Sequence, residues 1–381
     1  MVRMRPRALL VPLVALLACA VAVPAAASQE RAHPKPEPVS FSYLGETELP
    51  NALQFEGTTV GGLSSISWDA RTGKYLIISD DRSQIDPARF YTAAISARRG
   101  AVTLRLEATA PLRQADGSPF PPTSADGAVI APDPEGIAVD PRHRRFAWSS
   151  EGERVLSPLT LGDPAVRLAD ASGRTTATLP IAPQLHMNAQ EVGPRRNQTL
   201  EGLSYTPNGA QLWAAMEDPL YQDGEDPAAD HGARVRFTEY DAAHRLPVAQ
   251  YAYPLSPLFE AGPAGSTNGV SDIAALGGGR FLVLERAFTT RNKIRVFEAD
   301  ASRATDVLGR DALAAAPMTA MRKRLVVDLA AVHGLPRIDN VEGITVGPRL
   351  HDGRRLVVLV SDDNFSTGQV TQVIAFAASG L

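Results

Sequence analysis

The sequence predicts an all-β fold, a β-propeller of about five four-stranded blades. One hairpin pattern recurs five times along the 381-residue chain. Its copies start about every 70 residues, as expected for a repeat architecture. Between the copies lie further short segments of alternating hydrophobicity, which supply two more strands for each copy. Radial repetition of four-stranded sheets is the arrangement of a β-propeller.

Each copy consists of an alternating apolar stretch, a turn, and a second apolar stretch that ends in an acidic residue. The five copies occupy residues 61–82, 135–153, 201–218, 271–286 and 342–363. Apolar residues two positions apart open each copy: Ile66/Trp68, Ile137/Val139, Leu203/Tyr205, Ile273/Ala275 and Ile344/Val346. This period of two is typical of strands, and turns such as Pro207-Asn208-Gly209 join them into hairpins.

The outer strands follow the hairpins. Residues 90–95 pair with 102–108, and residues 235–240 pair with 248–253. The fifth copy is followed by a single strand over 370–376, so its blade lacks a fourth member. The strand-like segment 41–49 has no hairpin partner of its own, and we expect it to complete that blade and close the ring.

Two long insertions leave the number of blades open. Residues 155–192 and 298–330 are long enough to form a sixth blade. Within the second insertion, residues 311–323 predict a short helix. An open β-sandwich is the alternative fold, and five matching hairpins argue against it.

The N-terminal residues 1–27 predict a secretory signal peptide. Arg3, Arg5 and Arg7 precede an apolar run over 8–23, and small residues end at Ala27. Residues 28–39 form a Pro-rich linker, and residues 40–381 form the propeller domain. The alternative is a lipoprotein leader that anchors the chain at Cys19.

Composition narrows the class of protein. Cleavage after Ala27 removes three of the 38 basic side chains and none of the 42 acidic ones, which changes the formal net charge from −4 to −7. This balance argues against nucleic-acid binding. The single cysteine excludes a disulfide framework and Cys-based metal sites. No second long apolar run follows, so we expect a secreted, extracellular monomer without a membrane span.

Propeller geometry gathers acids at one mouth of the channel. In an antiparallel hairpin, the residue before the first strand and the residue after the second lie at the same end. Seven acids at such positions are the candidate metal ligands: Glu135, Glu151, Glu201, Glu217, Glu342, Asp362 and Asp80. The same geometry predicts further acids at this mouth: Asp81, Asp218, Asp363, and Glu285 beside Ser271. Packed carboxylates need neutralisation, and Ca²⁺ best matches many oxygen ligands. The alternative is that single acids tie neighbouring blades together.

Basic residues near these acids predict an anionic or ester-bearing ligand. Arg82, Arg286 and Arg196 are the candidates for holding it. A further acidic loop over 217–231 predicts a calcium-binding or lid loop, or a solvated turn. Nucleophile-elbow, Walker A, H-E-x-x-H and dinucleotide glycine motifs are absent from the sequence.

These motifs resemble the secreted phytase-like family named for "esterase-like activity of phytase". The matching elements are Gly61-Gly62-Leu63-Ser64, Ser79-Asp80-Asp81-Arg82, Asp133-Pro134-Glu135-Gly136, Ser150-Glu151-Gly152, Asn197, Glu201-Gly202-Leu203, Glu217-Asp218-Pro219-Leu220, Gln222-Asp223-Gly224, Leu284-Glu285-Arg286, Asn340-Val341-Glu342-Gly343-Ile344 and Ser361-Asp362-Asp363-Asn364-Phe365. The resemblance implies a propeller and a hydrolase of phosphate or carboxylic esters.

The leading hypothesis is a Ca²⁺-assisted ester hydrolase for small-molecule phosphomonoesters such as phytate, or for carboxylic esters. Glu201 and Glu135 are the candidate catalytic carboxylates. The first alternative is a lactonase-like propeller enzyme. The second is a non-catalytic extracellular binding propeller with structural Ca²⁺.

Overall fold

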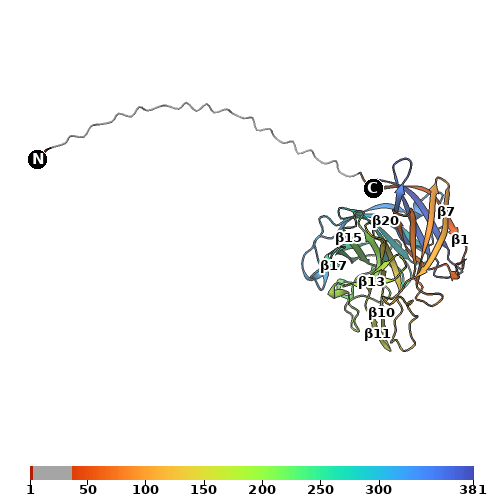
Figure 1. The fold of residues 1–381 in the computed structure, drawn as a ribbon, viewed down its shortest axis with the longest axis horizontal. Coiled ribbons are helices and arrows are strands. Elements are labelled where there is room, and N and C mark those ends of the chain that lie inside the picture. The colour runs from red at the N-terminus through yellow and green to blue at the C-terminus, as the bar shows by residue number, and fades with distance from the viewer. Residues whose placement is uncertain (3–36) are drawn as a thin grey trace, which may run out of the picture. The chain divides into compact units, whose positions relative to one another are not determined.

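The computed structural model describes residues 1–2 and 37–381, and five four-stranded antiparallel sheets dominate residues 37–381 (Figure 1). No α-helix occurs among the described residues. None of their helical turns is long and apolar enough to cross a membrane. Residues 3–27 of the predicted signal peptide, with Cys19, and residues 28–36 of the predicted linker lie outside the described residues.

The sheets are numbered here as blades 1 to 5. Blade 1 contains β4 (Leu63–Asp69), β5 (Lys74–Ser79), β6 (Arg89–Arg98) and β7 (Ala101–Pro111). Blade 2 contains β8 (Pro134–Val139), β9 (Arg145–Ser150), β12 (Ala165–Asp170) and β13 (Thr175–Leu179). Blade 3 contains β14 (Leu200–Tyr205), β15 (Gln211–Met216), β16 (Ala233–Asp241) and β17 (Leu246–Leu255).

Blade 4 contains β18 (Thr267–Gly277), β19 (Arg280–Phe288), β20 (Asn292–Asp300) and β21 (Arg322–Asp328). Blade 5 contains β22 (Asn340–Arg349), β23 (Arg355–Asp362), β24 (Thr371–Ser379) and β1 (Ser40–Leu49). The remaining elements are the hairpins β2 (Gln54–Phe55) with β3 (Thr58–Thr59) and β10 (Glu153–Leu156) with β11 (Leu159–Gly162), and the 3₁₀ turns η1 (Pro183–Leu185), η2 (Tyr221–Asp223), η3 (Leu313–Ala315) and η4 (Leu329–Ala331).

The first strands of the blades form a closed ring around the channel. Neighbouring first strands contact each other in the order β4, β8, β14, β18 and β22, and β22 returns to contact β4. The predicted all-β propeller is therefore confirmed. Strand β1 pairs with β24 from Ser40↔Ser379 to Leu49↔Thr371, so the predicted closure by the N-terminal strand is also confirmed.

The alternative of a sixth blade is wrong. The segment 155–192 supplies β12 and β13, and the segment 298–330 supplies β21. These strands complete blades 2 and 4, which would otherwise be two- and three-stranded sheets. The long insertions are thus the outer halves of blades already counted.

The helix predicted over 311–323 is also wrong, because only the short turn η3 forms there. Pro317 lacks the N–H that a helix interior needs. The carboxylate of Asp223 accepts a hydrogen bond from the Leu313 N–H at 2.8 Å, and Arg310 donates to the Ala316 carbonyl at 2.8 Å. These contacts hold the segment as a loop until β21 begins at Arg322.

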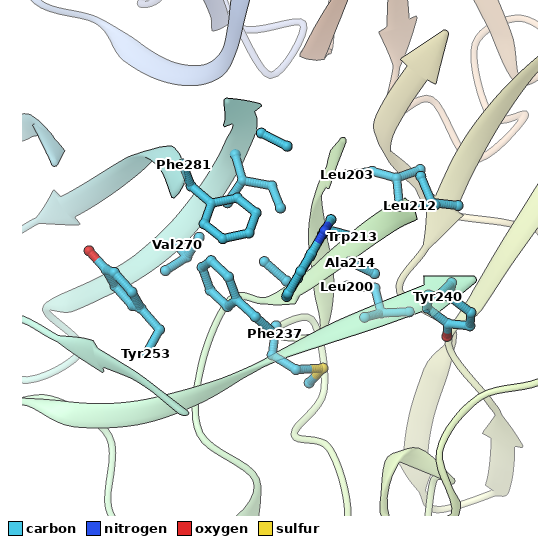
Figure 2. Packing of buried hydrophobic residues seen from close by; sticks show 14 of the residues in the cluster. Leu200, Leu203, Leu212, Trp213, Ala214, Phe237, Tyr240, Tyr253, Val270 and Phe281 are labelled. Atoms are coloured by element: carbon cyan, nitrogen blue, oxygen red, sulfur yellow. The ribbon is translucent and has the colours of Figure 1, made fainter. Parts of the chain in front are cut away.

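The hydrophobic core lies between the blades. Separate clusters fill the spaces between blades 1 and 2, across blades 2 to 4, between blades 4 and 5, and between blades 5 and 1. In the largest cluster Phe281 of blade 4 meets Trp213 edge-on at 4.8 Å and lies 6.0 Å from Phe237 (Figure 2). Such aromatic pairs fix the angle between neighbouring blades as well as burying apolar area.

Candidate functional site

Every blade begins its first strand with a β-bulge at the same end of the channel. The register shifts lie between Leu63/Ser65, Pro134/Ile137, Leu200/Leu203, Val270/Asp272 and Val341/Gly343. The bulged side chains are Ser64, Glu135, Glu201, Ser271 and Glu342. A bulge changes the direction of a side chain relative to regular pairing. Here it places three glutamates and two serines in one ring.

A second ring comes from the end of the second strand of each blade. The pairing register makes five residues equivalent: Asp80, Glu151, Glu217, Arg286 and Asp362. The two rings together contain all seven acids predicted as metal ligands, and Arg286 stands where blade 4 would otherwise supply an acid.

A cavity of about 430 Å³ opens at this mouth of the channel. Six of the seven predicted acids line it with Arg286, and Asp218, Asn197 and Asn340 add polar groups. The seventh acid, Glu151, lies next to the cavity because its carboxylate is within 4.8 Å of those of Glu201 and Glu217. The structure thus brings the predicted carboxylates of four blades together.

Two groups of carboxylates have spacings suited to a metal ion. Asp133, Glu135 and Glu151 form one, and Glu151, Glu201 and Glu217 form the other, each with ligand atoms within 4.8 Å of one another. Glu151 belongs to both. One of its oxygens accepts a hydrogen bond from the Thr199 N–H at 2.6 Å, whereas Oε2 is buried without a partner among the described residues. An unpaired buried carboxylate oxygen suits a cation.

Glu342 and Asp362 form a third part of the mouth. The Asn340 amide donates to Glu342 Oε1 at 2.9 Å and to Asp362 Oδ2 at 3.3 Å. The amide nitrogen faces both carboxylates, so it holds them as acceptors and orients them.

The buried carboxyl groups have raised pKa values. Burial, followed by the charge of Glu201, raises the pKa of Glu135 well above its ordinary range. Burial, with neighbouring acids as the next cause, likewise raises the pKa of Glu151 and Glu201. The pKa of Glu217 rises to about 7 by burial, and Arg286 opposes the rise. Protons or cations must therefore compensate these charges near neutral pH.

The predicted arginines occupy three different environments. Arg286 is half-buried between Glu217 and Glu342, at 3.2 and 3.5 Å. Arg82 forms an ion pair with Asp133 and donates to Asn197. Arg196 forms an ion pair with Glu153 at 2.8 Å, and its side chain is 57% exposed. Of these arginines, Arg286 lines the cavity.

Adjacent acids at the strand ends have separate roles. Asp80 and Asp362 line the cavity. Their neighbours Asp81 and Asp363, which we expected at the same mouth, instead hold loops. Asp81 accepts from the Gln84 and Asp86 N–H groups at 2.8 Å, and Asp363 accepts from the Gly62 and Phe365 N–H groups. Consecutive residues of an extended chain point to opposite sides, which separates each pair.

Glu285 was expected at the mouth beside Ser271 and lies elsewhere. It is fully buried within blade 4, where it accepts from the Tyr253 hydroxyl at 2.6 Å and pairs with Lys323. Its chain neighbour Arg286 takes the place at the mouth because the pairing register sets Arg286 opposite Gly269.

The predicted set of metal ligands omitted three acids that lie at or near the channel. Asp133 completes one of the carboxylate trios, and Asp218 lines the cavity. Both are direct chain neighbours of residues in the repeated motif, which was the available clue. Asp272 occupies the position that glycine takes in blades 2, 3 and 5, and its deviation from the repeat was a second clue.

Asp272 closes the channel behind the carboxylates. It accepts hydrogen bonds from the Ser65 hydroxyl of blade 1 at 3.0 Å and from the Ile344 N–H of blade 5 at 2.9 Å. Ser65 in turn accepts from the Ile137 N–H of blade 2. These bonds join blades 1, 2, 4 and 5 across the axis.

Glycine follows the bulged glutamates because the blades approach closely there. A Cβ on Gly202 would lie 2.9 Å from the Ile273 nitrogen, and one on Gly136 would lie 2.4 Å from the Glu201 carbonyl oxygen. Both contacts are to backbone of the next blade. The Glu-Gly pair therefore combines a charged bulge with close blade packing.

The acidic loop over 217–231 is held by ion pairs. The side chain of Asp223 is buried and bonds Arg236 at 2.6 and 2.8 Å, and Asp226 pairs with Arg195 at 2.8 Å. His186 does not line the cavity and pairs with the exposed Asp163.

Comparison with solved structures finds several weak similarities. An exo-β-1,3-galactanase from Phanerochaete chrysosporium is 10% identical, with a TM-score of 0.44 over 87% of this chain and 63% of that one, less than two thirds of its length. A GH43 β-1,3-galactosidase is 9% identical, with a TM-score of 0.48 over 86% and 93%. The WD40 repeats of RRP9 are 8% identical, with a TM-score of 0.36 over 88% and 100%. These values are too low to define the architecture, which rests on the strand order itself.

No protein with a curated description matches the chain. A family profile described as "Phytase-like: Esterase-like activity of phytase" matches residues 58–365. The match spans all five hairpins and both rings of site residues. The chain therefore belongs to the phytase-like family defined by the esterase-like activity of phytase.

Proposed function

We propose that this protein is a secreted hydrolase of small-molecule esters that requires a divalent cation, with Ca²⁺ as the cation and phosphomonoesters such as phytate as the first substrate class. The observation that carries the proposal is the ring of buried carboxylates with one arginine around an open cavity of about 430 Å³. Family membership supports ester hydrolysis in general.

The donor set fits a hard cation. The candidate ligands Glu135, Glu151, Glu201 and Glu217 supply only carboxylate oxygens and are at most 8% exposed. Glu342, Asp362 and Asp80 extend the same surface. Glu151 Oε2 and Asp218 Oδ1 are buried without hydrogen-bond partners among the described residues, as expected of atoms that bind a metal.

The chemistry follows from these groups. A bound divalent cation polarises an ester oxygen and lowers the pKa of water. Arg286 donates to the anionic or carbonyl oxygen of the substrate from its position between Glu217 and Glu342. Glu201 or Glu135 accepts a proton from the attacking water. A bond forms from the water oxygen to phosphorus or carbon, and the bond from that atom to the ester oxygen breaks. The leaving alkoxide takes up the proton that the carboxylate removed from the water.

The experiment measures turnover of p-nitrophenyl phosphate, phytate, p-nitrophenyl acetate and a lactone panel by the purified mature protein. We expect phosphomonoester hydrolysis that is lost in EGTA and restored by Ca²⁺. Chelator-insensitive activity would contradict the role of the cation. Hydrolysis of lactones alone would select the lactonase alternative.

The binding-propeller alternative predicts a different pattern. Ca²⁺ would raise the melting temperature because it binds the folded state, yet no ester would be hydrolysed. Melting curves with and without Ca²⁺, recorded on the same preparation as the turnover assays, distinguish a binding propeller from an enzyme.

A further inference from the structure

The channel has a second mouth that the ester-hydrolase proposal does not use. The first strands begin at the carboxylate ring and end at a separate cavity of about 480 Å³. Residues from the ends of these strands line it, including Trp68 of β4, Tyr205 of β14 and Val346 of β22. The two cavities therefore lie at opposite ends of the channel.

The layer formed by Asp272 and Ser65 separates the two cavities. Their hydrogen bonds to each other and to the Ile344 and Ile137 N–H groups span the channel axis. A ligand in the second cavity would thus not reach the carboxylates, and the two sites are chemically independent.

The inner wall of the second cavity is apolar. Each blade contributes one aliphatic side chain from the equivalent position of its first strand: Ile66, Ile137, Leu203, Ile273 and Ile344. These side chains are at most 2% exposed because they also pack in the core between the blades, so they form the floor of the cavity. Half-buried Trp68, Leu276 and Val346 supply its accessible apolar surface. The aromatic residues Trp68 and Tyr205 also line the cavity. An apolar ligand body fits this wall because its burial removes hydrocarbon from water.

The rim of the cavity carries uncompensated positive charge. Arg349 and Arg355 are direct cross-strand partners in the β22–β23 hairpin, and both line the cavity. Neither forms an ion pair within residues 37–381, and Arg355 Nε is buried without a hydrogen-bond partner there. Like charges directly opposite each other destabilise a hairpin. An anion between them would remove that cost.

Two nearby arginines, in contrast, have acidic partners. Arg354 pairs with Asp352 at 2.6 Å, and Arg280 pairs with Glu298. Burial and the charge of Arg349 also lower the pKa of Arg355, which agrees with a guanidinium that lacks an acidic partner. Among the four arginines that line the cavity, Arg71 and Arg280 have acidic partners, whereas Arg349 and Arg355 have none within residues 37–381.

We infer that the second mouth binds an amphipathic carboxylate, with its hydrocarbon body against Trp68, Leu276 and Val346 above the aliphatic floor and its carboxylate between Arg349 and Arg355. Guanidinium groups bind carboxylates through paired hydrogen bonds, and a buried apolar pocket with a few polar groups is the usual form of a small-molecule site. This site does not depend on the proposed ester hydrolysis.

Decanoate and its uncharged counterpart decanol are suitable probes. Trp68 lines the cavity, whereas Trp148 and Trp213 are buried in the core, so tryptophan fluorescence reports binding at this mouth. Titrations in EGTA, with calorimetry in parallel, keep the carboxylate ring out of the measurement. We expect saturable binding of decanoate and clearly weaker binding of decanol.

Three variants test the assignment. Arg355→Gln and Arg349→Gln should each weaken decanoate binding by about tenfold or more, as for the loss of a charge-assisted hydrogen bond. Arg354→Gln is the matched control and should bind as the wild type does. Ester hydrolysis should be the same in all three. Melting temperatures should rise in the first two because the like-charge pair is removed.

Three outcomes would contradict the binding of an amphipathic carboxylate at the second mouth. Absence of saturable decanoate binding, equal affinity for decanol, or unchanged decanoate affinity in the Arg349→Gln/Arg355→Gln double variant would overturn the inference. Because these measurements need no turnover, a failure of the ester-hydrolase proposal would leave their outcome unaffected.

Discussion

At the scale of single residues, the carboxylate ring depends on which of two adjacent side chains at each strand end faces the channel axis. Glu201 is central because it belongs to the bulge ring and forms a trio with Glu151 and Glu217. Its pKa is raised by burial and then by Glu217, so its charge is costly in the absence of a counter-charge.

Replacing this residue tests its role. Glu201→Gln keeps the shape of the side chain and removes one negative charge. We expect ester hydrolysis to fall by about 100-fold or more, and Ca²⁺ affinity to fall with it. In EGTA the variant should melt at a higher temperature than the wild type, because charge repulsion is relieved.

The matched control is Glu225→Gln, an exposed acid in the loop over 217–231. It should leave hydrolysis, Ca²⁺ affinity and melting temperature unchanged. If Glu201→Gln retained full turnover and Ca²⁺ response, the carboxylate would have only a structural role.

At the scale of elements, the Glu-Gly pair links the bulge to blade packing. The glutamate projects into the mouth, and the glycine allows the backbone of the next blade to approach. The second strand supports the same geometry through serines: Ser149 Oγ accepts from the Gly136 N–H at 2.7 Å, and Ser79 donates to the Gly61 carbonyl at 2.8 Å.

Gly202→Ala should therefore destabilise the fold. The added Cβ would lie 2.9 Å from the Ile273 nitrogen and 3.1 Å from Asp272 backbone atoms, which cannot yield without moving β18. We expect the free energy of unfolding in urea to fall by about 1–3 kcal/mol, as for other overpacked sites. The midpoint of urea unfolding measures this directly.

Gly309→Ala is the control for that substitution, because no atom lies within 4 Å of its Cβ position and its φ is not positive. Its unfolding midpoint should match the wild type or increase slightly. Equal midpoints for Gly202→Ala and Gly309→Ala would mean that β14 and β18 are not closely packed.

At the scale of the whole molecule, the ring of carboxylates makes stability depend on pH. Ordinary carboxyl pKa values are about 4 in unfolded chains, whereas burial raises those of the ring, that of Glu217 to about 7. The folded state then binds more protons than the unfolded state between these values. Stability contributed by the protonated groups is present at low pH and is lost as pH rises through this window.

We therefore expect metal-free protein in EGTA to melt at a lower temperature near about pH 8 than near about pH 5. Ca²⁺ should raise the melting temperature more at the higher pH, because the carboxylates are then ionised. By contrast, the hydrogen bond from Lys74 and the nearby Arg105 lower the pKa of Glu107 at the surface, so this acid does not add to the effect.

Melting curves at both pH values, with and without Ca²⁺, check this expectation. Glu201→Gln should show a smaller pH dependence than the wild type. A metal-free protein that is equally stable at both pH values would contradict compensation of the ring by protons.

The sequence by itself determined the propeller, its closing strand and the seven acids of the mouth. These features repeat at a spacing that hairpin geometry converts directly into position, so the shared location of Glu135 and Glu151 at one end of a blade follows from their spacing alone. The β1–β24 pairing followed from counting strands in the last blade.

Only the tertiary structure decided the rest. The alternation of side chains after β5 decides whether Asp80 or Asp81 faces the channel. In blade 4, the pairing register beside the bulge decides between Glu285 and Arg286. The closure of the channel by Asp272 depends on contacts between distant segments. The lack of acidic partners for Arg349 and Arg355 within residues 37–381 likewise depends on which segments come near them. Local sequence patterns carry no information about such contacts, because burial and pairing between blades arise only when the ring closes.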